Sequence, residues 1–409
     1  MNKILSHTIS LAFVSVSFTL SASQELIEKG KYLADAADCY ACHTTDDGQQ
    51  YGGGKAFPLP MGMKIYSTNI SSDKTFGIGN YTLEDFTAAL REGKSANNGY
   101  LYPAMPYGSY ALITDDDIKA LFAYFQTVPA VKQKKTDNDV YFPANVRTGI
   151  LGWNMLFLDD KRYLPDSEKS ENWNRGNYLV NSFGHCGECH TPRNLFMALE
   201  KDKPFQGAVI GSTWAPNITA ENLLKAGWGS DDLASLLRHG YSDKGVVTGE
   251  MYTVVKHSLS KLSEQDMRAV TGYLLNSDEY IASKTPVYDE KVITHEGYPT
   301  YMSYCASCHG DKGQGKPNFA PKMLGNGTLM EPNQYNVVYS IIGGIDSQYY
   351  NQVNSFDAMP SYQDKLSDQQ LLDLMNYLSA SFTFDKKEFT APEIKALRES
   401  VLESLETEH

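Results

Sequence analysis

The feature that most constrains this chain is a Cys-x-x-Cys-His motif that occurs three times and uses all six cysteines. The motifs are Cys39/Cys42/His43, Cys186/Cys189/His190 and Cys305/Cys308/His309. This is the attachment signature of a c-type haem: two thiols add to the vinyl groups, and the histidine binds the iron. A redox Cys-x-x-Cys pair or a zinc knuckle would not require the adjoining histidine, and zinc would need four converging ligands. Three covalent haems c are therefore predicted.

The amino terminus has the pattern of an export signal. Residues 1–23 begin with Lys3, continue through an apolar run and end in small residues, so the mature chain is expected to start near Gln24. A transmembrane anchor is the alternative, but the apolar run is short for one. Export agrees with the cysteine use, because haem c is attached outside the cytoplasm and no cysteine remains for a disulfide. The predicted location is periplasmic, at the outer face of the inner membrane.

The charge limits the partners. The formal net charge is −13, and it becomes −14 when Lys3 is removed with the signal. An acidic surface argues against nucleic acid and against anionic lipid as direct partners. It permits a basic docking face on another protein. Since no other stretch approaches membrane-spanning length, we expect a protein that is soluble or held peripherally at a membrane by a partner.

The segments around the three motifs align with one another, which indicates an internal repeat. Upstream, a helical stretch carries a glycine and an aromatic residue. Downstream, a second helix begins at a hydroxyl N-cap with an acid or amide three residues later, and a tyrosine follows ten residues after the cap. The caps are Thr114, Ser263 and Ser367, and the tyrosines are Tyr124, Tyr273 and Tyr377. We expect the two helices to cross through aromatic side chains and close around a haem.

The predicted fold is all-α, with three tandem class I cytochrome c domains. The expected order is a signal peptide at 1–23, domain 1 at 24–132, a packed connector at 133–170, domain 2 at 171–284, domain 3 at 285–386 and a C-terminal helical tail at 387–409. The connector is too apolar for a free linker, so we expect it to pack across the first two domains. The tail has an apolar face that could cover the protein itself or dock a partner.

Each repeat also offers a sixth iron ligand. A methionine before the closing helix would supply a soft thioether and raise the reduction potential. Met105, Met251 and Met359 lie 62, 61 and 50 residues after their motif histidines. A lone methionine is usually core filling, but three at one register are not explained that way. With all irons doubly ligated, electron transfer is favoured over haem catalysis.

Other ligands remain as alternatives. The competing methionines are Met61, Met63, Met323 and Met330, whose registers do not recur, and the spare histidines are His185, His239, His257 and His295. Two weaker features were ambiguous. The pairs Asn69-Ile70 and Asn217-Ile218 could place amide donors, with Trp214, near haem propionates or could be plain turns. Arg193 could pair with a propionate or be solvated.

Together these features resemble the tri-haem cytochrome c subunit of bacterial periplasmic dehydrogenases. The resemblance rests on the three motifs, their methionines, and the segments Ser67-Thr68-Asn69-Ile70, Cys189-His190-Thr191-Pro192-Arg193 and Ala358-Met359-Pro360. It implies that Cys39, Cys42, His43 and Met105 hold the first haem, Cys186, Cys189, His190 and Met251 the second, and Cys305, Cys308, His309 and Met359 the third.

The resemblance also implies partners. Such subunits take electrons from a catalytic dehydrogenase subunit, which is accompanied by a small chaperone-like third subunit, and pass them toward ubiquinone or another acceptor. A flavin-dependent gluconate or sugar dehydrogenase is the favoured partner. A quinoprotein alcohol dehydrogenase or a molybdenum aldehyde dehydrogenase is the alternative. The chain itself is expected to have no catalytic site. Two other hypotheses are a haem enzyme with one open iron and a freestanding electron shuttle.

Overall fold

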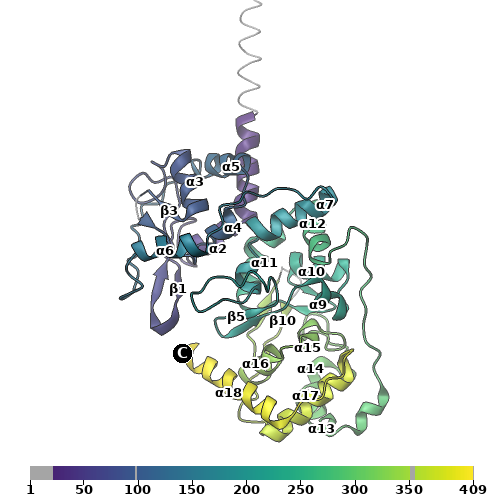
Figure 1. Ribbon diagram of the computed structural model, residues 1–409. Helices are drawn as coiled ribbons and strands as arrows, with labels where there is room; N and C mark the ends of the chain where they lie inside the picture. The colour runs from purple at the N-terminus through teal and green to yellow at the C-terminus, as the bar shows by residue number, and fades with distance from the viewer. Residues whose placement is uncertain (1–21, 97–98, 351–354, 409) are drawn as a thin grey trace, which may run out of the picture. The chain divides into compact units, whose positions relative to one another are not determined.

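The computed structural model describes residues 22–96, 99–350 and 355–408, and helices dominate its regular structure (Figure 1). Nearly all of the predicted signal peptide, residues 1–23, lies outside the described residues. The chain divides into two compact units. One ends at Pro165 and takes in Asn181–His185, and the other comprises Asp166–Val180 and Cys186–His409. The second unit therefore contains the second and third motifs.

The same order of elements surrounds each motif: a first helix, a short helix with the motif histidine, a loop, a long helix, a two-stranded hairpin and a closing helix. The first repeat has residues 22–36, α2 (Cys39–His43), α3 (Leu83–Glu92), β3 (Lys94–Ser95), β4 (Gly99–Tyr100) and α5 (Asp115–Phe125). The second has α7 (Glu171–Tyr178), α8 (Gly187–His190), α10 (Ser230–His239), β7 (Tyr241–Ser242), β8 (Gly245–Val246) and α12 (Glu264–Leu274). The third has α13 (Tyr298–Tyr304), α14 (Ala306–His309), α16 (Tyr335–Gly343), β9 (Gln348–Tyr349), β10 (Ser355–Phe356) and α17 (Asp368–Phe382).

Further elements complete the two units. They are β1 (Ala56–Pro58), η1 (Pro60–Gly62), β2 (Lys64–Tyr66), α4 (Tyr107–Tyr110), α6 (Thr148–Phe157), η2 (Leu179–Phe183), β5 (Ala208–Ile210), β6 (Thr213–Ala215), α9 (Ala220–Lys225), α11 (Gly249–His257), η3 (Leu259–Lys261), η4 (Glu290–Thr294), α15 (Gly327–Met330) and α18 (Ala391–Glu408). Each strand pairs antiparallel with one neighbour, so these are isolated hairpins and no larger sheet is built from the described strands. Helix packing therefore forms the core.

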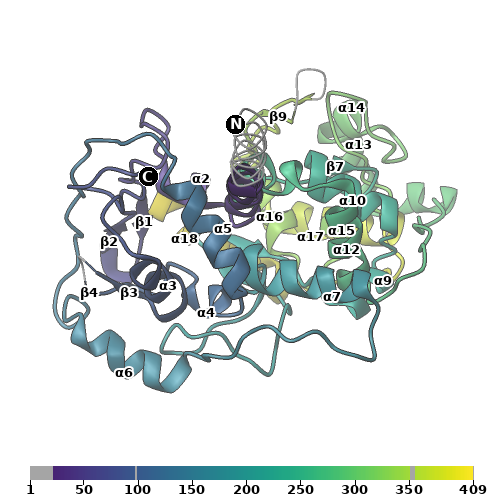
Figure 2. The ribbon, with the colours of Figure 1, turned by 90° about the horizontal axis from the view of Figure 1, so that it is seen from above.

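The first and closing helices of every repeat cross at a glycine. A Cβ added at Gly30, Gly176 or Gly297 would lie 1.9, 2.0 and 2.0 Å from the carbonyl oxygens of Ala120, Ala269 and Asp373, respectively. No side chain fits at such a distance, so only glycine lets the backbones approach this closely. Each of these carbonyls lies four residues before the tyrosine predicted at the crossing. In the second repeat, α7 and α12 lie side by side in Figure 1 and Figure 2.

The predicted starts of the closing helices are confirmed. The hydroxyls of Thr114, Ser263 and Ser367 accept hydrogen bonds from the backbone N–H three residues later at 3.3, 3.0 and 3.2 Å. These bonds satisfy an N–H that has no partner within the helix. At Ser367 the side chain of Gln370 also accepts the cap N–H at 3.1 Å, which completes a capping box.

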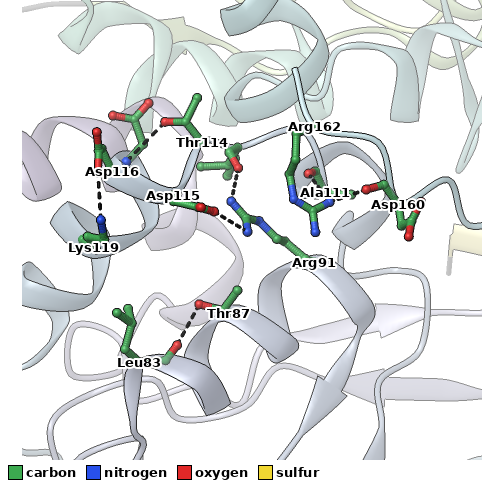
Figure 3. A network of polar contacts seen from close by, with 12 residues as sticks. Leu83, Thr87, Arg91, Ala111, Thr114, Asp115, Asp116, Lys119, Asp160 and Arg162 are labelled. Carbon is green, nitrogen blue, oxygen red and sulfur yellow. Dashed lines mark hydrogen bonds and ion pairs between the residues drawn. The ribbon is translucent and has the colours of Figure 1, made fainter. Parts of the chain in front are cut away.

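An arginine also fixes the start of the closing helix. In the first repeat, buried Arg91 on α3 donates to the Ile113 carbonyl and forms an ion pair with Asp115 at 2.7 Å (Figure 3). In the second repeat, Arg238 on α10 donates to the Leu262 carbonyl at 3.1 Å. Both acceptors directly precede the N-cap, and both arginines lie two residues before the glycine that ends their helix.

The third repeat takes its arginine from the tail. Ile342 occupies the corresponding position on α16, two residues before its terminal glycine. Arg398 on α18 instead donates to the Leu366 carbonyl at 2.8 Å and pairs with Asp368 at 2.9 Å. Leu366 directly precedes the cap Ser367, so the contact has the geometry of the Arg91 contact. A helix beyond the repeat thus supplies an interaction that the repeat lacks.

The apolar face of α18 covers the third repeat. Ile394 and Val401 are fully buried, and Leu405 contacts the end of α16 at Gly343. They join the same core as Val338 of α16, with α17 also in contact with α18. The tail therefore packs on the protein itself, one of the two roles predicted for it.

The connector packs on the first unit through α6. Trp153 lies edge-on to the ring of Tyr107 at 6.4 Å, and the Tyr107 hydroxyl donates to the Asn154 side chain at 2.8 Å. The outer side of α6 is apolar, because Met155 and Leu156 are each 75% exposed. Within the described residues, no helix combines the length and apolarity that a bilayer crossing requires.

Candidate functional site

All three motif histidines make the same hydrogen bond. The Nδ1 atoms of His43, His190 and His309 lie 2.7, 2.7 and 2.9 Å from the backbone carbonyl oxygens of Thr68, Pro216 and Pro321. A carbonyl can only accept, so Nδ1 must carry the proton in each ring. Nε2 is then the unprotonated nitrogen, available to a metal. A histidine ligand with its other nitrogen donating to a carbonyl is the usual arrangement in metal sites.

Burial keeps these rings neutral. Desolvation lowers the pKa of His43, His190 and His309 below the ordinary histidine value, and the bond to the carbonyl opposes this only partly. A neutral imidazole is the form that binds iron. The three rings are therefore prepared for ligation in both tautomer and charge.

Four of the six motif cysteines have raised pKa values, which disfavours a redox pair. Burial raises the pKa of Cys186 and Cys305 to about 12 and that of Cys189 to about 11, and it also raises the pKa of Cys39. A reactive thiolate pair needs a lowered pKa. Across the described ranges, no three His, Cys, Asp or Glu side chains gather as a metal cluster would require. The redox and zinc interpretations of the motifs thus lack their physical requirements, whereas thioether attachment needs neither.

The three predicted methionine ligands occupy one position in the repeat. Met105, Met251 and Met359 each follow the hairpin and precede the closing helix, and each is half-buried. Met251 differs in local structure, because it lies within α11, whereas Met105 and Met359 lie outside helices. Met359 packs against the core of the third repeat.

The third repeat is shorter than the other two only in the segment between the motif histidine and the carbonyl that accepts its proton. The carbonyl that accepts the histidine proton lies 25, 26 and 12 residues after the histidine in the three repeats. From that carbonyl to the methionine the spacing is 37, 35 and 38 residues. The hairpins β1–β2 and β5–β6 fill the longer loops, and the third repeat has a single isolated bridge there, Lys316 with Ala320. The segment from the carbonyl to the methionine therefore has nearly the same length in all three repeats, whereas the segment from the histidine to the carbonyl varies.

The competing ligands have other surroundings. Met61 is 74% exposed at the tip of the β1–β2 hairpin, and Met323 packs against the third core. The Nδ1 of His295 accepts the Gly297 N–H at 3.2 Å, and its ring lies 6.0 Å from that of Tyr377. His295 therefore supports the start of the third repeat's first helix.

The residues around the second motif fit a haem. The indole Nε1 of Trp214 is buried and has no hydrogen-bond partner among the residues that the structure describes. A buried N–H of this kind costs free energy unless something accepts it. Trp214 lies on the loop that carries the acceptor carbonyl of His190, and a haem propionate is a carboxylate acceptor. The orphaned donor, the neutral histidine and the two thiols together suit haem c.

Both features with two interpretations make hydrogen bonds within the protein. The side-chain oxygens of Asn69 and Asn217 each accept both the N–H and the hydroxyl of the residue two positions on, at 2.9 and 2.7 Å in both cases. These pairs are turns. Arg193 forms an ion pair with Glu188 at 2.7 Å and donates to the Met197 carbonyl at 2.8 Å, so its partners lie within its own loop.

The sequence did not indicate which residues hold the segment that accepts the proton of His190. Residues 214–217, here called the strap, carry the carbonyl that accepts from His190, and the third repeat holds this strap. The Asn336 side chain bonds both the N–H and the carbonyl of Trp214, at 3.0 and 2.7 Å. Glu331 accepts the N–H of Asn217 at 3.1 Å. No sequence signal could have found these residues, since each lies more than a hundred positions from its partner.

Two family models match parts of the chain. A model described as "Cytochrome c" matches residues 27–129. A model described as "Cytochrome C oxidase, cbb3-type, subunit III" matches residues 293–378. The two stretches contain the first and the third motif. The second motif lies between them in the same order of elements.

Relatives of known function match almost the whole length. The fructose dehydrogenase cytochrome subunit of Gluconobacter japonicus is 36% identical, covering 92% of this chain and 84% of its own. The gluconate 2-dehydrogenase cytochrome c subunit of Pantoea cypripedii is 36% identical, covering 92% and 90%. The cytochrome c subunit of the alcohol dehydrogenase (quinone) of Gluconobacter oxydans is 34% identical, covering 90% and 82%.

Proposed function

The chain belongs to the family of dehydrogenase cytochrome c subunits, and from that premise we propose that it is a three-haem electron-transfer subunit. The observation that carries the proposal is the threefold recurrence of one site: a buried neutral histidine with Nδ1 bonded to a carbonyl, and a methionine 35 to 38 residues after that carbonyl. Three such sites suit three tandem class I cytochrome c domains. Haem c, when bound, supplies the redox chemistry.

The ligand set follows from the sites. Cys39, Cys42, His43 and Met105 would hold the first haem, Cys186, Cys189, His190 and Met251 the second, and Cys305, Cys308, His309 and Met359 the third. The carbonyls of Thr68, Pro216 and Pro321 fix the orientation of the histidine rings. This leaves no open position for oxygen or a substrate, which supports electron transfer over catalysis by the chain itself.

Protein surroundings tune each site. Histidine bonded to a carbonyl becomes a more basic ligand, which stabilises oxidised iron, whereas a methionine thioether favours reduced iron. Burial of the rings excludes water and keeps the ligands in place.

The partner is proposed from the relatives. Their names place them with fructose, gluconate and quinone-dependent alcohol dehydrogenases. We favour a flavin-dependent gluconate or sugar dehydrogenase as the catalytic partner, with a small third subunit and with ubiquinone or another respiratory acceptor downstream. A quinoprotein alcohol dehydrogenase is the alternative, and co-purification with a flavoprotein or a quinoprotein decides between them. The site of action would be the periplasm.

The test is haem content and ligation in the protein produced by an export strain. Intact mass should show three covalent haems, and fewer would contradict the proposal. Replacing Met105, Met251 or Met359 by alanine should each remove one third of the thioether charge-transfer absorbance and lower one potential. The reduced native protein should not bind carbon monoxide rapidly. Rapid binding would indicate an open iron and a haem enzyme.

A further inference from the structure

A buried carboxyl of the third repeat bonds the loop that orients the second histidine. Glu331 follows α15 and is 8% exposed. One carboxyl oxygen accepts the Asn217 N–H at 3.1 Å, and the other accepts the Asn222 side-chain amide at 2.9 Å. Both bonds cross from the third repeat to the second within one compact unit.

One peptide group joins this carboxyl to the proposed iron ligand. The Asn217 N–H and the Pro216 carbonyl are the two ends of the same peptide bond. That carbonyl accepts Nδ1–H of His190 at 2.7 Å, while the N–H donates to Glu331 at 3.1 Å. Hydrogen bonds in such a chain polarise one another. A negative charge on Glu331 therefore makes the carbonyl a stronger acceptor and His190 a more electron-rich ligand.

We propose that Glu331 couples proton binding to the redox state of the second haem and so sets its potential. The inference rests on the proposed electron-transfer function. When one electron arrives from the catalytic partner, Glu331 takes up one proton from solvent. When that electron leaves for the next acceptor, the proton returns to solvent. In this role Glu331 is a positioning residue that acts through the strap.

The surroundings of Glu331 allow it to titrate. Burial raises the pKa of this carboxyl to about 7, and its bonds to Asn217 and Asn222 oppose the rise only partly. Oxidised iron carries one more positive charge than reduced iron and favours the ionised carboxyl. The potential of the second haem should therefore fall as pH rises through the neutral range and level off on either side.

Among the residues that the structure describes, the segments around Glu331 carry few other charged groups. The strap and residues 327–334 contain no charged residue besides Glu331, and the titratable groups of α16 are Tyr335 and Tyr339. On α9, Glu221 is exposed, and Lys225 pairs with Asp385 at 2.8 Å. Lys244, whose carbonyl accepts the Gly327 N–H at 2.7 Å, is buried, and its ammonium donates to the carbonyls of Ala226 and Lys284. His190 is held neutral.

The experiment is spectroelectrochemical titration of the full holoprotein from about pH 5.5 to 8.5, on both sides of the raised pKa. In the native protein, one of three components should vary with pH. Glu331→Gln should make that component independent of pH and raise it to the native low-pH value. Glu221→Gln removes the same charge from an exposed site on α9 and should leave the pH dependence intact.

Two further variants separate the possible failures. Met251→His should lower the same component, which assigns it to the second haem. If Met251→His changes no component, the ligand assignment of the proposed function is wrong and the inference falls with it. Asn336→Ala loosens the strap without changing charge, so it should shift the component but keep its pH dependence. The inference alone is overturned if the Met251-sensitive component is flat with pH in the native protein, or if it keeps its slope in Glu331→Gln.

Discussion

At the scale of single residues, the proposed sites are built from groups whose hydrogen-bonding capacity suits a haem. The histidine Nδ1 atoms are satisfied by carbonyls, so that Nε2 is left for iron. Trp214 is the opposite case, because its Nε1 donor is buried and has no acceptor within the described part of the chain. We read it as a donor to a propionate of the second haem.

Trp214→Phe tests this assignment. Loss of the donor leaves a propionate charge less neutralised, so the potential of the second haem should fall. The holoprotein should lose about 1 kcal/mol of unfolding free energy, the typical net value of a hydrogen bond. Were the N–H unpartnered in the holoprotein, its removal would leave stability unchanged or raise it. Trp173→Phe is the control, since its N–H bonds Asn276 at 3.1 Å, and it should leave the potential unchanged. Spectroelectrochemistry and urea unfolding provide the two readouts.

At the scale of elements, the repeats keep their contacts even where they change which segment supplies them. The arginine that fixes the closing helix comes from α3 and α10 in the first two repeats and from the tail helix in the third. The exchange has a packing reason. Ile342, in place of the arginine, is fully buried in a core shared by α16, α17 and α18. The tail is therefore part of the third repeat's structure.

Arg398→Met should loosen the third repeat. It removes two carbonyl contacts and the ion pair with Asp368, which we expect to lower the local stability of α17 by about 2 kcal/mol. Hydrogen exchange of α16 and α17 measures this change. Lys395→Met is the control on the same helix, because the Lys395 pair with Glu399 is exposed and contributes little. Equal exchange rates in the two variants would contradict the assigned role of Arg398.

At the scale of the whole molecule, the charge governs encounters with other redox partners. The formal net charge of −13 does not include haem propionates, which would make it more negative. Attraction between opposite net charges speeds association at low salt, and screening removes the effect over about 10 Å at 0.1 M. The rates of electron transfer to cationic and to anionic acceptors should therefore respond to added salt in opposite directions.

Stopped-flow oxidation of the reduced holoprotein measures this effect. The rate with a cationic acceptor such as hexaammineruthenium(III) should fall as salt is added. The rate with anionic hexacyanoferrate(III) should rise over the same range. Parallel responses to salt would show that a local patch, and not the net charge, controls the encounter.

Much of the architecture could be predicted from the sequence because it depends on local signals. The Cys-x-x-Cys-His motifs, the caps Thr114, Ser263 and Ser367, and the methionine register are short patterns with direct physical meaning. The glycines of the helix crossings were visible as part of the repeat, although the reason for them is a carbonyl about 2 Å away on another helix.

Only the tertiary structure decided which segments far apart in the chain contact one another. The sequence by itself determined that a Cys-x-x-Cys-His motif recurs three times and that a candidate methionine follows each motif, since both follow from spacing. It could not indicate that Arg398 replaces an arginine missing from α16, or that Glu331 bonds the strap behind His190. Such pairs have no fixed spacing, because folding of the whole chain brings them together. The potential of the second haem is proposed to depend on one of them.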